Sequence, residues 1–226
     1  MENVKSMLEF NSAPPWENEG IPRLSIAASL LLFSIFVMPV VIRSVPQLKL
    51  PLPDIMLFSA LPGVIAYNFV SAEKLPLRML TWHEVMSILL FGLLLLTFSG
   101  CVTAAWKFIL NALKIPFSGT QEALIAIKGI SGVEKIRMFF GVCILPPVLE
   151  ELLFRRLLYG ALLRLGKIPS TVLTAMTFSL CHFFVAGLPG LFLLGLGFQY
   201  VYLKYRNLAA AMFLHFLVNA TAFVFA

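Results

Sequence analysis

Residues 138–163 of the chain read MFFGVCILPPVLEELLFRRLLYGALL, and this stretch decides the class of fold. It is long enough to cross a bilayer as a helix, which takes about 20 apolar residues. Four charged residues interrupt it, namely Glu150, Glu151, Arg155 and Arg156. An ionisable side chain inside a bilayer costs about 2.5–3.5 kcal/mol on insertion scales, so it persists where it pairs or takes part in chemistry. The stretch therefore predicts a membrane helix that carries a functional site.

The composition of the whole chain supports a membrane protein. Of its 226 residues, 60% are hydrophobic and 12% are charged, and the mean hydropathy is +0.93. Soluble domains are about 45–50% apolar and about 25% charged, so a water-soluble globular protein is excluded. The net charge of +6 indicates that the chain has basic loops, which in a membrane protein usually face anionic lipid on the cytoplasmic side. We expect no nucleic-acid binding, because no basic run with interleaved aromatic residues is present.

The apolar segments predict an all-α transmembrane bundle of about seven spans. We expect them at Ser25–Ile42, Asp54–Ala72, Met86–Trp106, Met138–Leu163, Ser170–Ala186, Gly190–Tyr202 and Leu208–Phe225. The third and fourth spans are joined by a charged connection, in which Ala123–Ile130 has the rhythm of an interfacial amphipathic helix. The basic residues favour a cytoplasmic position for the connections at Lys167 and Lys204.

Few polar residues remain in the C-terminal spans. After Glu134 the chain has only two acids, Glu150 and Glu151, and after His83 only two histidines, His182 and His215. Residues four apart share a helix face, which pairs Glu151 with Arg155, Phe178 with His182, and His215 with Asn219. An ion pair between Glu151 and Arg155 would leave Glu150 free to act on a substrate or a water. The alternative is purely structural ion pairing of both glutamates with the two arginines.

Two prolines precede the glutamates. Proline lacks a backbone N–H and breaks or kinks a helix, but it fits well in a first turn. We therefore expect a half-helix that restarts near Pro147 and places Glu150 in its first turn. There the positive end of the helix dipole would help to keep the carboxylate ionised.

Three motifs in the last four spans resemble those of a known family. Glu150-Glu151-Leu-Leu-Phe-Arg155 is similar to the EExxxR signature of the CAAX-protease and bacteriocin-processing (CPBP, or Abi) family of intramembrane endopeptidases. Phe178-Ser-Leu-Cys-His182 is similar to its FxxxH motif, and His215-Phe-Leu-Val-Asn219 to its HxxxN/D motif. The resemblance covers roughly Met138–Phe225, and we expect residues 138–226 to form a four-helix protease core. Residues 1–137 carry no such motif and form an expected N-terminal membrane region.

The resemblance implies a glutamate protease that needs no cofactor. It assigns Glu150 as the general base that activates a water, and His182 as the residue that positions or polarises this water. His215 and Asn219 match the residues that would stabilise the tetrahedral oxyanion, a role for which an amide donor is well suited. The supporting residues that the motifs imply are Glu151, Arg155 and Phe178.

The resemblance also implies the partners. They are the bilayer and a peptide or membrane-anchored substrate, such as a prenylated CAAX-type tail or the leader of a secreted peptide. We expect a multi-pass protein of a prokaryotic plasma membrane, because no organelle-targeting peptide is evident.

Several alternatives stay open at this point. Glu150, His182 and His215 could instead bind a catalytic zinc, which takes three protein ligands and a water. A non-catalytic immunity or scaffold protein could retain the same fold, and a small transporter could use the same residues as a proton relay. Two motifs are rejected. His83-Glu84 lacks the second histidine of HExxH, and Gly129-Ile130-Ser131-Gly132 lies in the charged connection and not in an apolar helix.

Overall fold

A computed structural model describes residues 21–45, 52–66, 76–119, 125 and 127–226 of the chain. Within these ranges every regular element is helical and no strand occurs, which confirms the all-α class. The N-terminal helices are α3 (Ile21–Leu32), the π-helix η1 (Phe33–Val37), α4 (Met38–Arg43), α5 (Leu52–Ser59) and α6 (Leu61–Ala66). The long helix α7 (Trp82–Ala112) follows and corresponds to the third expected span.

The C-terminal helices begin at residue 132. They are α9 (Gly132–Phe139), η4 (Phe140–Ile144), α10 (Leu145–Glu151), η5 (Leu152–Leu158), α11 (Tyr159–Leu162), η6 (Leu163–Leu165), α12 (Lys167–Leu180), η7 (Val185–Gly187), α13 (Leu188–Tyr205) and α14 (Leu208–Phe225). The expected end of the second span, residues 67–72, lies outside the described residues, as do three of the eight residues of the expected amphipathic helix at Ala123–Ile130.

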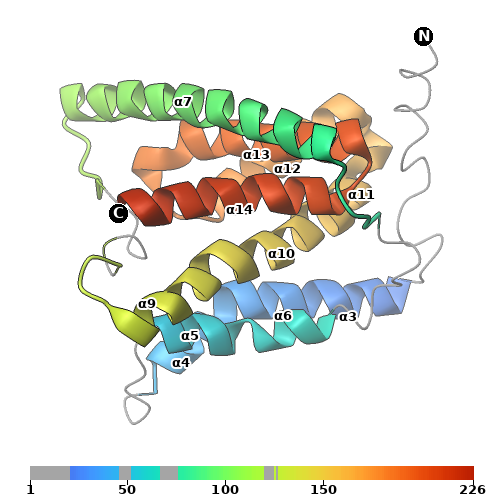
Figure 1. Ribbon diagram of the computed structural model, residues 1–226, viewed down its shortest axis with the longest axis horizontal. Helices are drawn as coiled ribbons and strands as arrows, with labels where there is room; N and C mark the ends of the chain where they lie inside the picture. Colours follow the sequence, from blue (N-terminus) through green and yellow to red (C-terminus); the bar gives the residue numbers. More distant parts are fainter. Residues whose placement is uncertain (1–20, 46–51, 67–75, 120–124, 126) are drawn as a thin grey trace.

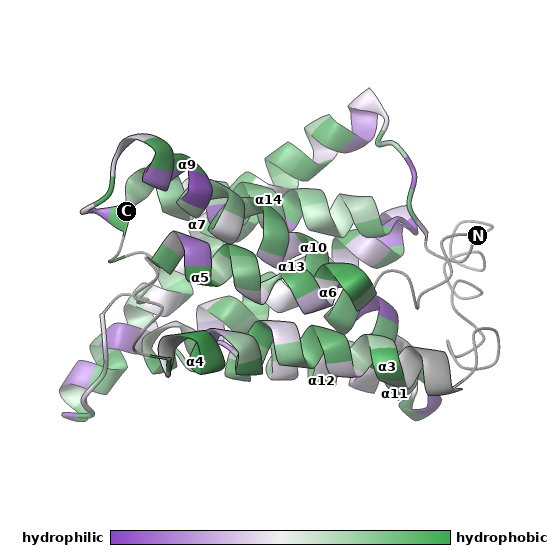
Figure 2. Ribbon diagram, turned by 90° about the horizontal axis from the view of Figure 1, so that it is seen from below, coloured by the Kyte–Doolittle hydropathy of each residue, from purple (hydrophilic) through white to green (hydrophobic). Residues whose placement is uncertain are grey.

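Three of the described helical segments are long and apolar enough to cross a membrane: Trp82–Ala112, Val185–Tyr205 and Leu208–Phe225. Two shorter apolar helices, Ile26–Ile42 and Asp54–Ala66, lie within the first two expected spans. Figure 2 shows that hydrophobic residues dominate the helices, whereas hydrophilic residues gather in α9 and toward the ends of the bundle. These features describe a multi-pass helical membrane protein.

The fourth expected span is a continuous run of helical segments with two π-helical turns. In η4 the N–H of Leu145 bonds to the carbonyl of Phe140, five residues back. The widened turn lies directly before Pro146 and Pro147, which cannot donate a backbone hydrogen bond. The prolines therefore widen the helix without restarting it. The prediction that Glu150 lies in a first helical turn is wrong, because α10 begins at Leu145 and follows another helical turn.

Helix α13 lies at the centre of the C-terminal part. It packs against α12, α7 and α14 (Figure 1). A Cβ added at Gly197 would lie 2.3 Å from a methyl of Leu95 in α7, and one at Gly195 would lie 3.1 Å from Cα of Ala175 in α12. Glycine at these two positions lets the helix backbones approach closely, as is common between membrane helices.

One hydrophobic core joins the N-terminal and C-terminal helices. Its buried members include Ala27 and Leu31 in α3, Ile88 in α7, and Leu152 and Leu214 in the C-terminal part. The expected division of the chain at residue 137 stays a prediction, but the two parts share this core.

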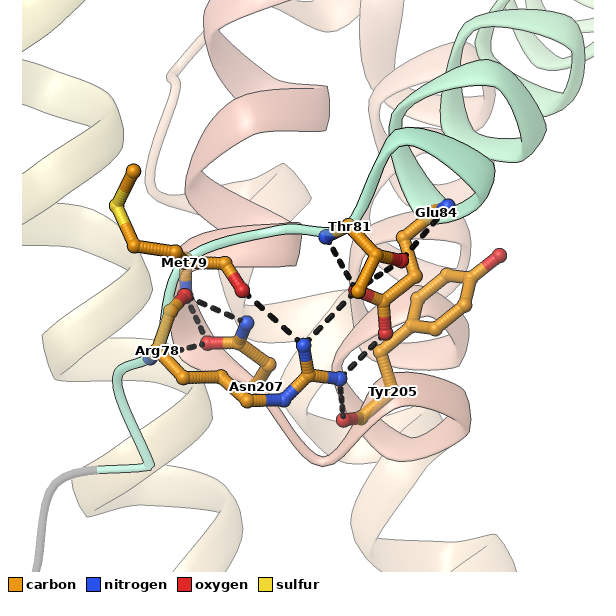
Figure 3. Close-up of polar contacts among 7 residues, drawn as sticks. Arg78, Met79, Thr81, Glu84, Tyr205 and Asn207 are labelled. Carbon is orange, nitrogen blue, oxygen red and sulfur yellow. Dashed lines mark hydrogen bonds and ion pairs between the residues drawn. The ribbon is translucent and has the colours of Figure 1, made fainter.

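A polar clasp ties the segment before α7 to the turn between α13 and α14 (Figure 3). Asn207 accepts hydrogen bonds from the N–H groups of Ala209 (3.1 Å) and Arg78 (3.2 Å), and its amide donates to the Arg78 carbonyl at 2.9 Å. The Arg78 guanidinium donates to Glu84 and, at 3.4 Å, to the Tyr205 carbonyl. The bond to Glu84 raises the pKa of Arg78, so the guanidinium stays charged. The clasp therefore fixes the start of α7 on the C-terminal helices.

Candidate active site

The carboxylate of Glu151 joins three helical segments in the core. Its Oε2 lies 2.9 Å from Nε of Arg155, one turn further along η5, and its Oε1 lies 2.9 Å from Nδ1 of His215 in α14. The side chains of Glu151 and Arg155 are fully buried, and that of His215 is 3% exposed. The predicted pairing of Glu151 with Arg155 is confirmed, and His215 is a second partner that the spacing did not indicate. Because removing one member of a buried pair leaves an uncompensated charge, the three residues depend on one another.

Three phenylalanines surround the Arg155 guanidinium. Its carbon lies 5.2 Å from the ring centre of Phe178, 5.6 Å from that of Phe198 and 5.9 Å from that of Phe154. These distances fit cation–π contacts. Phe198 also stacks on His215, with ring centres 4.5 Å apart. Sequence reasoning missed Phe198, because an aromatic residue in an apolar helix has no feature that separates it from ordinary core.

His182 lies just beyond the end of a helix. Helix α12 ends at Leu180, although the apolar run continues to Ala186. The His182 ring packs 4.6 Å from the ring of Phe178, and its Nδ1 lies 2.8 Å from the Phe178 carbonyl oxygen. A nitrogen facing a carbonyl must carry the hydrogen, so in the neutral ring Nε2 keeps its lone pair. The i,i+4 pattern therefore predicts the contact correctly, but His182 lies beyond the end of α12 while Phe178 lies within it.

The short helix η7, which follows the turn with His182, is held by α7. The indole N–H of Trp106 donates to the Val185 carbonyl at 2.9 Å. Within the turn, Phe183 has a φ of +50°, a conformation that costs energy for a non-glycine residue. Trp106 thus restrains the segment that follows the end of α12.

Glu150 faces a cavity beside the Glu151 pair. The cavity has a volume of about 160 Å³ and lies between α10 and the N-terminal helices. Oε2 of Glu150 is buried and has no hydrogen-bond partner among the described residues. The carboxylate interacts electrostatically with His215, Glu151 and Arg155, so it lies near the paired groups without being hydrogen-bonded to them. The ion pair observed in this region is that of Glu151, and Glu150 keeps an available oxygen.

Asn219 is bound to the widened turn before the prolines. Its Nδ2 donates to the carbonyl of Val142 at 2.9 Å. The residues four and five positions after Val142 are Pro146 and Pro147, which have no N–H to offer this carbonyl. Asn219 satisfies an acceptor that the helix itself cannot. One of its two N–H hydrogens remains for another acceptor.

The alternative sites are less well supported by the geometry. Across the described ranges, no three His, Cys, Asp or Glu side chains lie close enough together to hold a metal ion, so Glu150, His182 and His215 do not form a ready zinc site. His83 is exposed at the start of α7, and Ser131 is exposed directly before α9.

A comparison with protein families assigns the C-terminal part. Residues 132–221 match the model of a family described as type II CAAX prenyl endopeptidase Rce1-like. These 90 of the 226 residues are similar to that family. The match confirms the resemblance carried by the three motifs. It also confirms the expected class of enzyme, a peptidase. No curated protein and no solved structure matches the chain.

The Rce1-like region runs from the start of α9 to near the end of α14 and contains every motif residue. Helices α3 to α7 lie outside it. They nevertheless contribute the far wall of the Glu150 cavity and the Trp106 contact to the His182 turn.

Proposed function

We propose that the protein is an intramembrane endopeptidase of glutamate type, in which Glu150 is the general base. The observation that carries the proposal is the free Oε2 of Glu150, buried beside a second glutamate whose charge is already paired. A general base must be unengaged and close to the proton that it takes. Glu150 meets the first condition.

Hydrolysis then proceeds in two steps, attack by the water and breakage of the C–N bond. Glu150 takes one proton from the water while the water oxygen attacks the peptide carbonyl carbon. Nε2 of His182, which has a lone pair, accepts a hydrogen bond from the other water hydrogen and orients the oxygen. Glu150 next gives its proton to the amide nitrogen, the C–N bond breaks, and an acid and an amine leave.

His215 must carry a hydrogen on each ring nitrogen to act on the oxyanion. Its Nδ1 faces Glu151, so a donor toward substrate has to come from Nε2. Asn219 supplies the second donor through the N–H that Val142 does not use. One such donor is worth about 10²–10³ in rate.

The family description supports a proposal for the substrate class. Prenylated CAAX-type tails are the first candidates, and leader peptides of secreted peptides or other membrane-anchored segments are the second. The proposed mechanism uses no metal. The proposed location is a prokaryotic plasma membrane.

The decisive experiment uses Glu150→Gln protein purified in detergent, with a farnesylated CAAX peptide and a panel of leader peptides as probes. We expect cleavage to fall at least 10²-fold, because the amide cannot take a proton. Glu134→Gln, on the exposed side of α9, is the matched control and should cleave like the wild type. Activity of Glu150→Gln near the wild-type level would exclude the general-base role. A chelator should leave the wild type active, whereas a full loss restored by zinc would favour the zinc-dependent alternative.

A further inference from the structure

The cavity at Glu150 is built by two parts of the chain with different origins. Pro146, Leu149 and Glu150 come from α10, inside the Rce1-like region. Ile35 and Met56, from η1 and α5, line the opposite side and lie outside that region. The N-terminal helices therefore form part of the space into which Glu150 faces.

Among the described residues, Glu150 is the only charged one that lines the cavity. Ser34 and Ser59 also line it, but their hydroxyl hydrogens are used: Ser34 donates to the Ser59 carbonyl, and Ser59 donates to the Ile55 carbonyl at 2.6 Å. The remaining lining side chains are hydrophobic or proline. A guest in this cavity thus meets one carboxylate and an apolar surface, which suits an apolar group next to a polar bond.

The size of the cavity limits what can enter. Its volume of about 160 Å³ lies below the range of about 300–1,000 Å³ that is typical of sites for whole small molecules. A prenyl chain and its peptide would not fit together. A single side chain of a peptide whose backbone runs past Glu150 would fit.

Met56 is placed to set the size limit. A Cβ added at Gly141 would lie 3.0 Å from Cβ of Met56, so α5 packs directly on η4 at this point. Methionine is flexible and fills irregular gaps, and its replacement changes the free volume with little effect on the backbone.

We propose that this cavity receives one apolar side chain of the peptide beside the bond that Glu150 cleaves, and that Met56 determines how large this side chain can be. The proposal rests on the proposed function. It assigns substrate selection to a helix outside the Rce1-like region, whereas the chemistry belongs to residues inside it.

The test measures cleavage of farnesylated peptides that differ only in the residue after the prenylated cysteine, which is Ala, Leu or Phe. Mass spectrometry identifies the products and the bond that is cut. Met56→Ala should raise the ratio of kcat/KM for Phe over Leu at least tenfold, because one methylene in an apolar pocket already changes selectivity about tenfold or more. Met56→Phe should shift the same ratio in the opposite direction. Met86→Ala, on an exposed face of α7, is the matched control and should leave the ratio unchanged.

A second measurement does not need turnover. In a Met56→Cys, Glu150→Gln protein, the Leu peptide should protect Cys at position 56 from N-ethylmaleimide at least fivefold, and a peptide with Asp at that position should not. Equal labelling with and without the Leu peptide, or size ratios that match the wild type in both Met56 variants, would overturn the subsite. Glu150→Gln protein that cleaves normally would instead overturn the proposed function, so the two failures are distinct.

Discussion

Asn219 in α14 donates a hydrogen bond to the carbonyl of Val142, the acceptor that Pro146 and Pro147 leave without a helical partner. One amide thus joins the last helix to the widened turn that precedes the glutamates. Its place in the HxxxN motif therefore has a structural reason in addition to the proposed catalytic one.

The first prediction concerns this bond. Asn219→Ala should lower the free energy of unfolding by about 1–3 kcal/mol, because it leaves a buried carbonyl without a donor. It should also reduce cleavage of a farnesylated peptide. Thermal unfolding in detergent, with Thr221→Ala in the same helix as a control, measures the first effect. An Asn219→Ala protein that unfolds like the control would contradict the structural role.

The second prediction concerns the buried pair of Glu151 and Arg155. Glu151→Gln should destabilise the fold by about 3–5 kcal/mol, since the Arg155 charge stays buried without its counter-charge. Adding Arg155→Met should recover much of this loss and leave the protein inactive.

The half-exposed ion pair of Arg137 and Asp54 is the control for the substitutions at Glu151 and Arg155. Asp54→Asn should cost about 0–1 kcal/mol, as is usual for exposed pairs. If Glu151→Gln and Asp54→Asn lower the free energy of unfolding by the same amount, the buried pair does not stabilise the core as predicted.

The third prediction concerns the turn that carries His182. Trp106→Phe keeps an aromatic ring but removes the donor to Val185, so we expect kcat to fall about tenfold with little change in KM. The melting temperature should stay near that of the wild type. Trp82→Phe, on an exposed face of the same helix, should leave kcat unchanged. A parallel change in the two variants would show that the contact to Val185 does not position His182.

The fourth prediction compares two glycines. Gly197→Ala should destabilise the protein by about 1–3 kcal/mol, because its Cβ would meet Leu95 at 2.3 Å. Gly100→Ala has open space around the new Cβ and lies inside α7, so it should stabilise by about 0.5–1 kcal/mol. Chemical unfolding of both variants gives the sign of each effect, and equal signs would contradict the close approach of α13 to α7.

Local patterns predicted the parts of the site that lie on one helix. The pairing of Glu151 with Arg155 follows from a spacing of four residues. The contact of His215 with Glu151 spans 64 residues and depends on how α14 crosses α10, which no local pattern encodes. The end of α12 at Leu180 could not be predicted either, because the residues from Leu180 to Ala186 contain no glycine or proline that would indicate a helix end.

The prolines were interpreted correctly as a disturbance and wrongly as a restart. A π-helical turn precedes them, with one bond to a carbonyl five residues back, and Asn219 from a distant helix bonds to the Val142 carbonyl in this turn. The assigned roles of Glu150, His182, His215 and Asn219 in catalysis stay predictions.

Helix α7 is fastened near both of its ends to the C-terminal helices, through Arg78 and Asn207 at its start and through Trp106 and Val185 near its far end. Contacts at two points oppose a movement of α7 away from the C-terminal helices. We therefore expect a substrate arriving through the lipid to enter on the opposite flank, where α3, α5 and α6 lie against η5, η4 and α10.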